Sequence, residues 1–149
     1  MRQRLRTRLR REDGAALLEM AVVLPLLLFL SVAIFEFGRA YQTWQVLTNA
    51  AREGARVAVL PGVNDAAVRD RVKTYIAAGQ LGTVADSAIT VNRSTTVTIG
   101  AGVTAPASLV QIQYPFTFIV MQPVANLLVN GSTVGSAMTI QTSATMRNE

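Results

Sequence analysis

The sequence predicts an α+β protein, in which a long N-terminal transmembrane helix packs through its distal part on a small antiparallel sheet. Two observations carry this prediction. A long apolar run near the N-terminus is followed by an amphipathic pattern of helical period, which ends at Leu60-Pro61-Gly62. After Asp86 the apolar residues recur with a period of two, and Thr becomes frequent, as in strands with one solvated face.

The composition favours a membrane protein and leaves little for catalysis. Of the 149 residues, 50% are hydrophobic and 15% are charged, which is more apolar than is usual for a soluble domain of this size. The chain has neither Cys nor His, which excludes thiol and imidazole chemistry. Asp65 and Asp70 diverge on a helix and make a poor metal pair. We therefore expect no enzyme activity, no cofactor and no metal site.

The positive charge is concentrated at the N-terminus. Residues 1–14 contain six Arg and two acidic residues, and so hold +4 of the total charge of +5. The remaining residues carry eight basic and seven acidic groups, with no basic patch interleaved with aromatics. We therefore expect no nucleic-acid partner.

Residues 15–36 are predicted to be the transmembrane part of the N-terminal helix. Between Ala15 and Phe35 the only charged side chain is Glu19. As a helix this run extends over roughly 31 Å, which is about the thickness of the hydrocarbon core of a bilayer. The preceding arginines favour a cytoplasmic N-terminus, so the rest of the chain is expected on the other side of the membrane.

Glu19 allows three interpretations. The segment could be a signal peptide, since Ser31-Val32-Ala33 offers the small-x-small pattern of a leader peptidase site. It could be a simple signal anchor whose helix begins near Met20, with Glu19 among the lipid headgroups. Glu19 could also be functional, which is the default for an ionisable group within a membrane span.

Residues 37–60 are predicted to continue the helix as an amphipathic segment. One face carries apolar residues at helical spacing, which we expect to lie on the sheet: Phe37, Tyr41, Trp44, Leu47, Ala51, Ala55 and Ala58. Ala51, Gly54 and Ala55 form a face so small that another backbone can approach closely. Trp44, Leu47, Ala51, Gly54 and Ala55 are therefore the candidate helix-packing residues.

Residues 61–149 are predicted to form the outer α+β domain. A second helix is expected after a cap at Asn64 or Asp65 and is expected to stop at Gly79. The expected strands are two short runs at 89–91 and 97–99 separated by Asn92-Arg93-Ser94, a longer run at 109–120 interrupted at Pro115, and a closing run at 138–142. Residues 123–128 suggest a short helical turn.

Two stretches of the sequence carry a family resemblance. Gly14 followed by AALLE, after an Arg-rich leader, is similar to a type IV prepilin cleavage region. The longer stretch GAALLEMAVVLPLLLFL, continued by FEFGRAYQTWQVLTNAAREGARVAV, resembles the TadE-like family of pseudopilins from tight-adherence (Flp) pilus systems. The resemblance covers about residues 14 to 59 and rests on Gly14, Glu19 and Pro25 together with FGRA and NAAREGAR.

The resemblance implies a pilin-like fold and a processed membrane subunit. A prepilin peptidase would cut between Gly14 and Ala15 and release residues 1–14 as a basic leader. Glu19 could then be neutralised by the new Ala15 amine of its own chain or of a neighbouring subunit, and the second option would make it an assembly residue. Ala15 is not the aromatic residue of many major pilins, which leaves N-methylation open.

The function expected from the resemblance is that of a minor pilin-like subunit, acting in the initiation or assembly of a Tad/Flp-type pilus. Its expected location is the bacterial inner membrane, as a single-pass protein with a periplasmic C-terminal domain and a possible place in the pilus. The expected partners are a prepilin peptidase, other pilins or pseudopilins, and inner-membrane assembly proteins. The alternative is a membrane-anchored or secreted module whose outer sheet binds a ligand.

Overall fold

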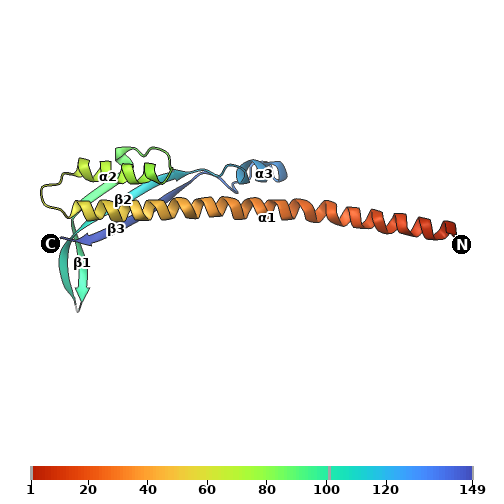
Figure 1. Ribbon diagram of the computed structural model, residues 1–149, viewed down its shortest axis with the longest axis horizontal. Helices are drawn as coiled ribbons and strands as arrows, with labels where there is room; N and C mark the ends of the chain where they lie inside the picture. Colours follow the sequence, from red (N-terminus) through yellow and green to blue (C-terminus); the bar gives the residue numbers. More distant parts are fainter. Residues whose placement is uncertain (1, 101, 149) are drawn as a thin grey trace. The chain divides into compact units, whose positions relative to one another are not determined.

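The computed structural model describes residues 2–100 and 102–148, with only the backbone described for residues 2–13 and Leu128. The side chains of the predicted basic leader, apart from Gly14, lie outside the described residues. The elements in chain order are α1 (Arg2–Ala58), α2 (Asp65–Ala78), a short 3-10 helix (Asp86–Ala88), β1 (Ile89–Gly100), β2 (Val103–Phe116), α3 (Met121–Leu128) and β3 (Met138–Arg147) (Figure 1). The predicted α+β fold, with its long helix and small antiparallel sheet, is confirmed.

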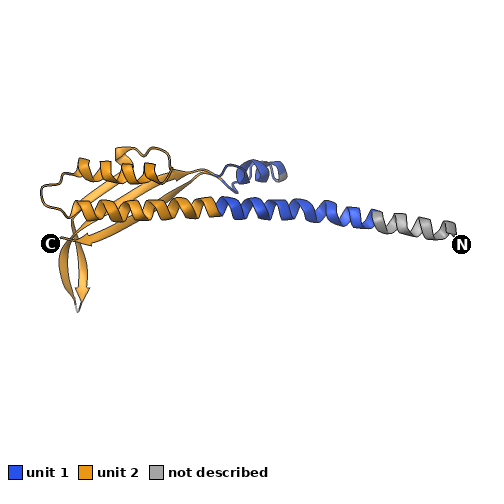
Figure 2. Cartoon of the chain, viewed as in Figure 1, with its two compact units in different colours: residues 1–37, 118–135 blue, residues 38–117, 136–149 orange. Residues whose placement is uncertain are grey.

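The chain divides into two compact units (Figure 2). Unit 1 consists of residues 1–37 and 118–135, and therefore combines the first part of α1 with α3. Unit 2 consists of residues 38–117 and 136–149, and contains the rest of α1, α2 and the whole sheet.

The sheet of unit 2 has the order β1-β2-β3, and both strand pairs are antiparallel. The expectation of two short runs at 89–91 and 97–99 is wrong, because residues 89–100 form one strand. The polar residues between the runs form an irregularity in the register between Asn92 and Thr95, where the Asn92 side chain accepts a hydrogen bond from the Ser94 N–H at 2.9 Å. A bulge therefore replaces the expected break.

The central strand β2 begins earlier and ends earlier than the predicted run at 109–120. It tolerates two prolines because each lies where only one neighbouring strand is paired. Pro106 pairs with Thr96 of β1 before the β3 register begins at Ala107, and Pro115 pairs with Thr139 of β3 beyond the end of the β1 register. Proline is compatible with such positions because they resemble the edge of a sheet.

The core of unit 2 lies where α1 and α2 pack on the sheet. Its fully buried members include Leu47, Ala50, Ala51 and Ala55 of α1, Val68 and Val72 of α2, and Ala107, Val110 and Ile112 of β2. The predicted caps of α2 are confirmed: the Asn64 side chain accepts the Ala67 N–H at 2.8 Å, and Gly79 is the C-cap. These caps fix where α2 starts and stops on the sheet.

The expectation that Phe37, Tyr41 and Trp44 lie in the core is wrong. Their exposed fractions are 59%, 60% and 43%. The buried face of α1 passes instead through Thr43, which is 3% exposed, and Leu47, which is fully buried. Leu47, Ala51, Ala55 and Ala58 of the predicted face are buried, so only its aromatic half differs, and the large rings lie on the flank of the helix.

Unit 1 consists of the apolar part of α1 together with the segment 118–135. In α3, Met121 and Ala125 are buried, with exposed fractions of 4% and 6%. The Phe37 and Phe118 rings meet edge to face with centroids 6.1 Å apart. These contacts place α3 alongside α1 within this unit (Figure 2).

Candidate functional site

The first candidate feature is the apolar surface of α1. The part of α1 from Gly14 to Ala58 includes an 18-residue window with a mean hydropathy of 2.6, none of which is buried. The exposed side chains include Leu17, Leu18, Leu26 and Ile34, which are each 66–72% exposed. Ser31 donates its hydroxyl to the carbonyl of Leu27 at 2.8 Å and so satisfies its own polar group. By length and composition this helix is suited to cross a membrane.

The predicted processing residues lie at the start of this surface. Gly14, Ala15 and Glu19 all belong to α1, and Ala15 and Glu19 are exposed. A Cβ atom at Gly14 would meet nothing within 4 Å, so the chain itself imposes no requirement for Gly there. A glycine inside a helix costs about 1 kcal/mol relative to alanine, which makes this turn the easier one to open.

Sequence reasoning missed the role of Glu36, which is fully buried. Its carboxylate oxygen Oε1 accepts the backbone N–H of Ile119 at 2.7 Å and that of Val120 at 2.6 Å. Val120 is the N-cap of α3, so an acid at the end of the apolar run of α1 fixes the start of α3. No local pattern signals this contact, because the bonded residues are 83 and 84 positions apart.

Arg39 holds the end of β2. Its guanidinium donates to the carbonyl oxygen of Thr117 and lies over the Phe116 ring, with the guanidinium carbon 4.4 Å from the ring centroid. A cation over an aromatic face is an attractive contact that survives partial burial. The FGRA stretch therefore contributes a structural cation.

The small face of α1 packs against both α2 and the sheet. Ala51 and Ala55 are fully buried. A Cβ atom at Gly54 would lie 2.5 Å from Val72 of α2 and 3.2 Å from Val110 of β2. The close approach that the sequence indicated at Gly54 is therefore made to elements of the same chain.

Glu53, the acid in NAAREGAR, forms ion pairs both within α1 and with α2. Glu53 binds Arg56 in its own helix at 2.9 Å and Arg71 of α2 at 2.8 Å. The hydrogen bonds from Arg56 and then from Arg71 lower the pKa of Glu53 from 4.5 to about 2. Glu53 thus links α1 and α2 as a charged group at neutral pH.

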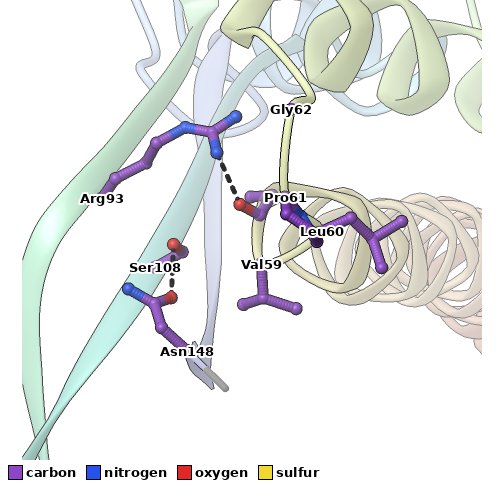
Figure 3. Close-up of a pocket in the computed structure, with 8 residues that line it drawn as sticks. Val59, Leu60, Pro61, Gly62, Arg93, Ser108 and Asn148 are labelled. Atoms are coloured by element: carbon purple, nitrogen blue, oxygen red, sulfur yellow. Dashed lines mark hydrogen bonds between the residues drawn. The ribbon is translucent and has the colours of Figure 1, made fainter.

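A hollow of about 480 Å³ lies beside the C-terminal end of α1 (Figure 3). Arg93, in the irregular part of β1, donates to the carbonyl of Ala58 at 2.7 Å, to that of Val63 at 2.8 Å and to Asp65 at 2.8 Å. Ser108 donates its hydroxyl to Oδ1 of Asn148 at 2.8 Å, and both line the hollow (Figure 3). These side chains close the end of α1 rather than converge on an empty position, so the hollow does not favour the ligand-binding alternative.

The described residues offer no group of three acidic side chains that could hold a metal ion. Of the predicted site residues, Leu47, Ala51, Gly54 and Ala55 lie together in unit 2, and Trp44 is on the exposed flank of the same helix. Gly14, Ala15 and Glu19 lie in unit 1.

Comparison with known proteins gives one match. Residues 14–56, all of them within α1, match the family model described as TadE-like protein, which confirms the resemblance predicted from this segment. No significant match was found among curated proteins or among solved structures. The match covers less than a third of the chain and coincides with the helix that is long and apolar enough to cross a membrane.

Proposed function

We propose that this chain, with its TadE-like segment, is a minor pilin-like subunit of a Tad/Flp-type pilus assembly or secretion apparatus and is processed by a prepilin peptidase. The observation that carries the proposal is that the matched residues 14–56 are one helical stretch, apolar and exposed in its first half and packed on a sheet in its second. An anchoring half and a scaffold half on one helix suit a subunit that is first held in a membrane and then assembled.

The proposed topology follows from the distribution of charge. Six arginines precede the apolar run, and positive residues beside a first span favour the cytoplasmic side. The sheet of unit 2 is then periplasmic, with the anchor in the inner membrane. The absence of Cys is compatible with that compartment, since the buried side chains of unit 2 form a core without disulfides.

The proposed processing step is cleavage of the peptide bond between Gly14 and Ala15. Water adds across that bond, which leaves the leader with a C-terminal carboxylate and the mature chain with an ammonium at Ala15. A glycine before the scissile bond lets a protease approach the backbone closely. The leader removes the arginines at 2, 4, 6, 8, 10 and 11, so the mature chain loses most of its positive charge.

The proposed role of Glu19 begins with that cleavage. The new ammonium lies four residues from the Glu19 carboxylate, on a helix whose side chains here point away from the rest of the chain. An exposed carboxylate at the edge of an apolar surface is costly in lipid unless it is paired. The ammonium of a neighbouring subunit would supply that partner and would fix how far one helix slides along the next.

Intact-mass measurement of the membrane-bound protein tests this proposal. The expected mature chain starts at Ala15. Gly14→Leu should leave the precursor uncut, whereas Gly38→Leu, a matched change at another open helical glycine, should leave cleavage unaffected. A mature chain that starts at Ile34 would establish cleavage by a leader peptidase and refute the pilin-like function.

A further inference from the structure

The segment 118–135 exposes several large apolar side chains beside the candidate membrane helix. Leu127, Val129 and Ile119 are 86%, 64% and 62% exposed, and Val134 is 50% exposed. The buried side of α3, at Met121 and Ala125, faces its own unit, so the exposed residues form an outer face. An apolar face of this kind normally marks a contact with lipid or with another protein.

The position of α3 along α1 matches the end of the apolar run. Phe29, Val32 and Ala33 are less exposed than their neighbours and share a helix face with Glu36, at the spacing i, i+3, i+4 and i+7. Glu36 binds the residues before α3, and Phe37 contacts Phe118. The segment 118–135 therefore covers the last two turns of the apolar part of α1.

The charge pattern of the sequence agrees with a lipid contact. Residues 94–146 contain no Asp, Glu, Lys or Arg, although the rest of the outer part of the chain is charged at an ordinary density. A segment that enters the hydrocarbon region excludes charged side chains at a cost of several kcal/mol each. The segment 118–135 therefore carries no charged side chain that would oppose its entry into lipid, a property that it shares with the neighbouring strands of unit 2.

Several backbone groups of the segment are paired within its own unit. The backbone N–H groups of Ile119 and Val120 donate to the Glu36 carboxylate, and Pro123 has no N–H group to satisfy. Further bonds join Val124 to Val120, Val129 to Ala125, and Ser132 to Val129, at 2.9–3.1 Å. Each such bond lowers the cost of placing a backbone group at membrane depth.

Gly135 closes the segment tightly. Its φ is +75°, and a Cβ atom at this position would lie 2.7 Å from the backbone nitrogen of Gln122. The chain thus returns directly over the first turn of α3, and the segment is a compact loop with its own packing. Such a loop can enter an interface without unfolding.

We propose that the segment 118–135 is embedded in the periplasmic leaflet of the membrane, against its own α1, as a second lipid-contacting element. The occupant of its exposed apolar face is lipid, because the face adjoins the apolar surface of the span and lacks charge. The proposal rests on the proposed membrane anchor. The subunit must then withdraw both α1 and the segment 118–135 when it leaves the bilayer.

Site-specific fluorescence in vesicles tests the proposal. The chain contains no Cys, so Leu127→Cys, Ile99→Cys and Leu24→Cys each provide a single labelling site in the full chain. Ile99 is the control, because it is 50% exposed but belongs to β1 in unit 2. Leu24 reports on the anchor. The labelled chains are reconstituted into vesicles of phosphatidylethanolamine and phosphatidylglycerol and treated with a lipid-borne spin-label quencher or with aqueous iodide.

Lipid quenching at position 127 is expected to exceed that at position 99 at least about twofold, with the reverse order for iodide. If the label at position 24 is quenched by the lipid-borne quencher but the label at position 127 is quenched by iodide, the proposed anchor is supported and the embedded loop is refuted. If position 127 is protected from both quenchers, a protein covers it and the lipid assignment is refuted. If the label at position 24 is quenched by iodide, the proposed membrane anchor itself is refuted.

Discussion

Arg71 of α2 donates two hydrogen bonds to Oε1 of Glu53 in α1, from Nε at 3.0 Å and from Nη2 at 2.8 Å. Arg56 binds the same carboxylate from within α1. The fold therefore places one acid between two cations on the two helices that cover the sheet, which makes stability depend on pH.

The first prediction concerns that dependence. The pKa of Glu53 is lowered in the folded chain from 4.5 to about 2, so folding favours the charged carboxylate. Its contribution is fully present above pH 4.5 and is lost as the pH falls from 4.5 toward 2. Glu53→Gln should flatten the decline of the melting temperature over that range, measured on the full chain in detergent micelles. Asp70→Asn, which changes an exposed carboxylate of α2, is the control and should keep the wild-type profile.

The second prediction separates the two large residues of the amphipathic stretch. Leu47→Ala should lower the free energy of unfolding by about 2–5 kcal/mol, because Leu47 is fully buried. Trp44→Ala should cost less than about 1 kcal/mol, because Trp44 is 43% exposed and its ring contact is with Tyr41 of the same helix. Denaturant titration of both variants measures the difference, and equal losses would contradict the packing described for α1.

The third prediction concerns the close approach at Gly54. Gly54→Ala should destabilise the chain by about 1–3 kcal/mol, since its Cβ would lie 2.5 Å from Val72. Val72→Ala should relieve part of that loss, so the double variant should lose less than the sum of the two single variants, by about 1 kcal/mol. Gly38→Ala is the matched control, because its Cβ meets nothing within 4 Å and should be neutral or stabilising. Additive losses would refute direct contact between positions 54 and 72.

The fourth prediction concerns Arg93. Arg93→Lys keeps the charge but loses the planar group that reaches Ala58, Val63 and Asp65 together. The free energy of unfolding should fall by about 1–3 kcal/mol. Arg52→Lys, on the exposed side of α1, should change it little. A stable Arg93→Lys variant would mean that the end of α1 does not depend on this guanidinium.

The fifth prediction follows from the proposed assembly role of Glu19. Glu19→Gln removes the charge and keeps the shape, so insertion and cleavage after Gly14 should proceed as in the wild type. Crosslinking to partner pilins and pilus production should decrease, because the Ala15 ammonium of a neighbour loses its counter-ion. Western blots of processed protein and counts of piliated cells measure the two effects. Normal piliation by this variant would remove Glu19 from the assembly mechanism.

The local features of the fold could be predicted because their causes are local. The caps of α2 depend on Asn64 and Gly79 at its two ends, and the apolar run of α1 is visible in any window of the sequence. The aromatic half of the predicted face of α1 could not be predicted in the same way. Large apolar residues were expected to point inward, whereas the sheet and α2 approach so closely that Thr43, Ala50 and Gly54 occupy the contact.

The non-local contacts could not be predicted from the sequence because each joins residues that are far apart in the chain. Glu36 meets Ile119 and Val120, and Arg93 of β1 meets Ala58 at the end of α1. Only the folded chain shows that each serves the end of a helix, Glu36 at the start of α3 and Arg93 at the end of α1.

The charge-free stretch also determines how the protein can be detected. Trypsin cuts after Arg and Lys, so β2, α3 and β3 remain together on one large peptide that runs from Ser94 to Arg147. Lys73 is the single lysine, and it is paired with Asp86. Amine-reactive reagents therefore have two targets in a chain cut after Gly14, Lys73 and the new terminus at Ala15. Labelling of a Lys73→Arg variant would then report on the Ala15 amine alone and on whether a neighbouring subunit shields it.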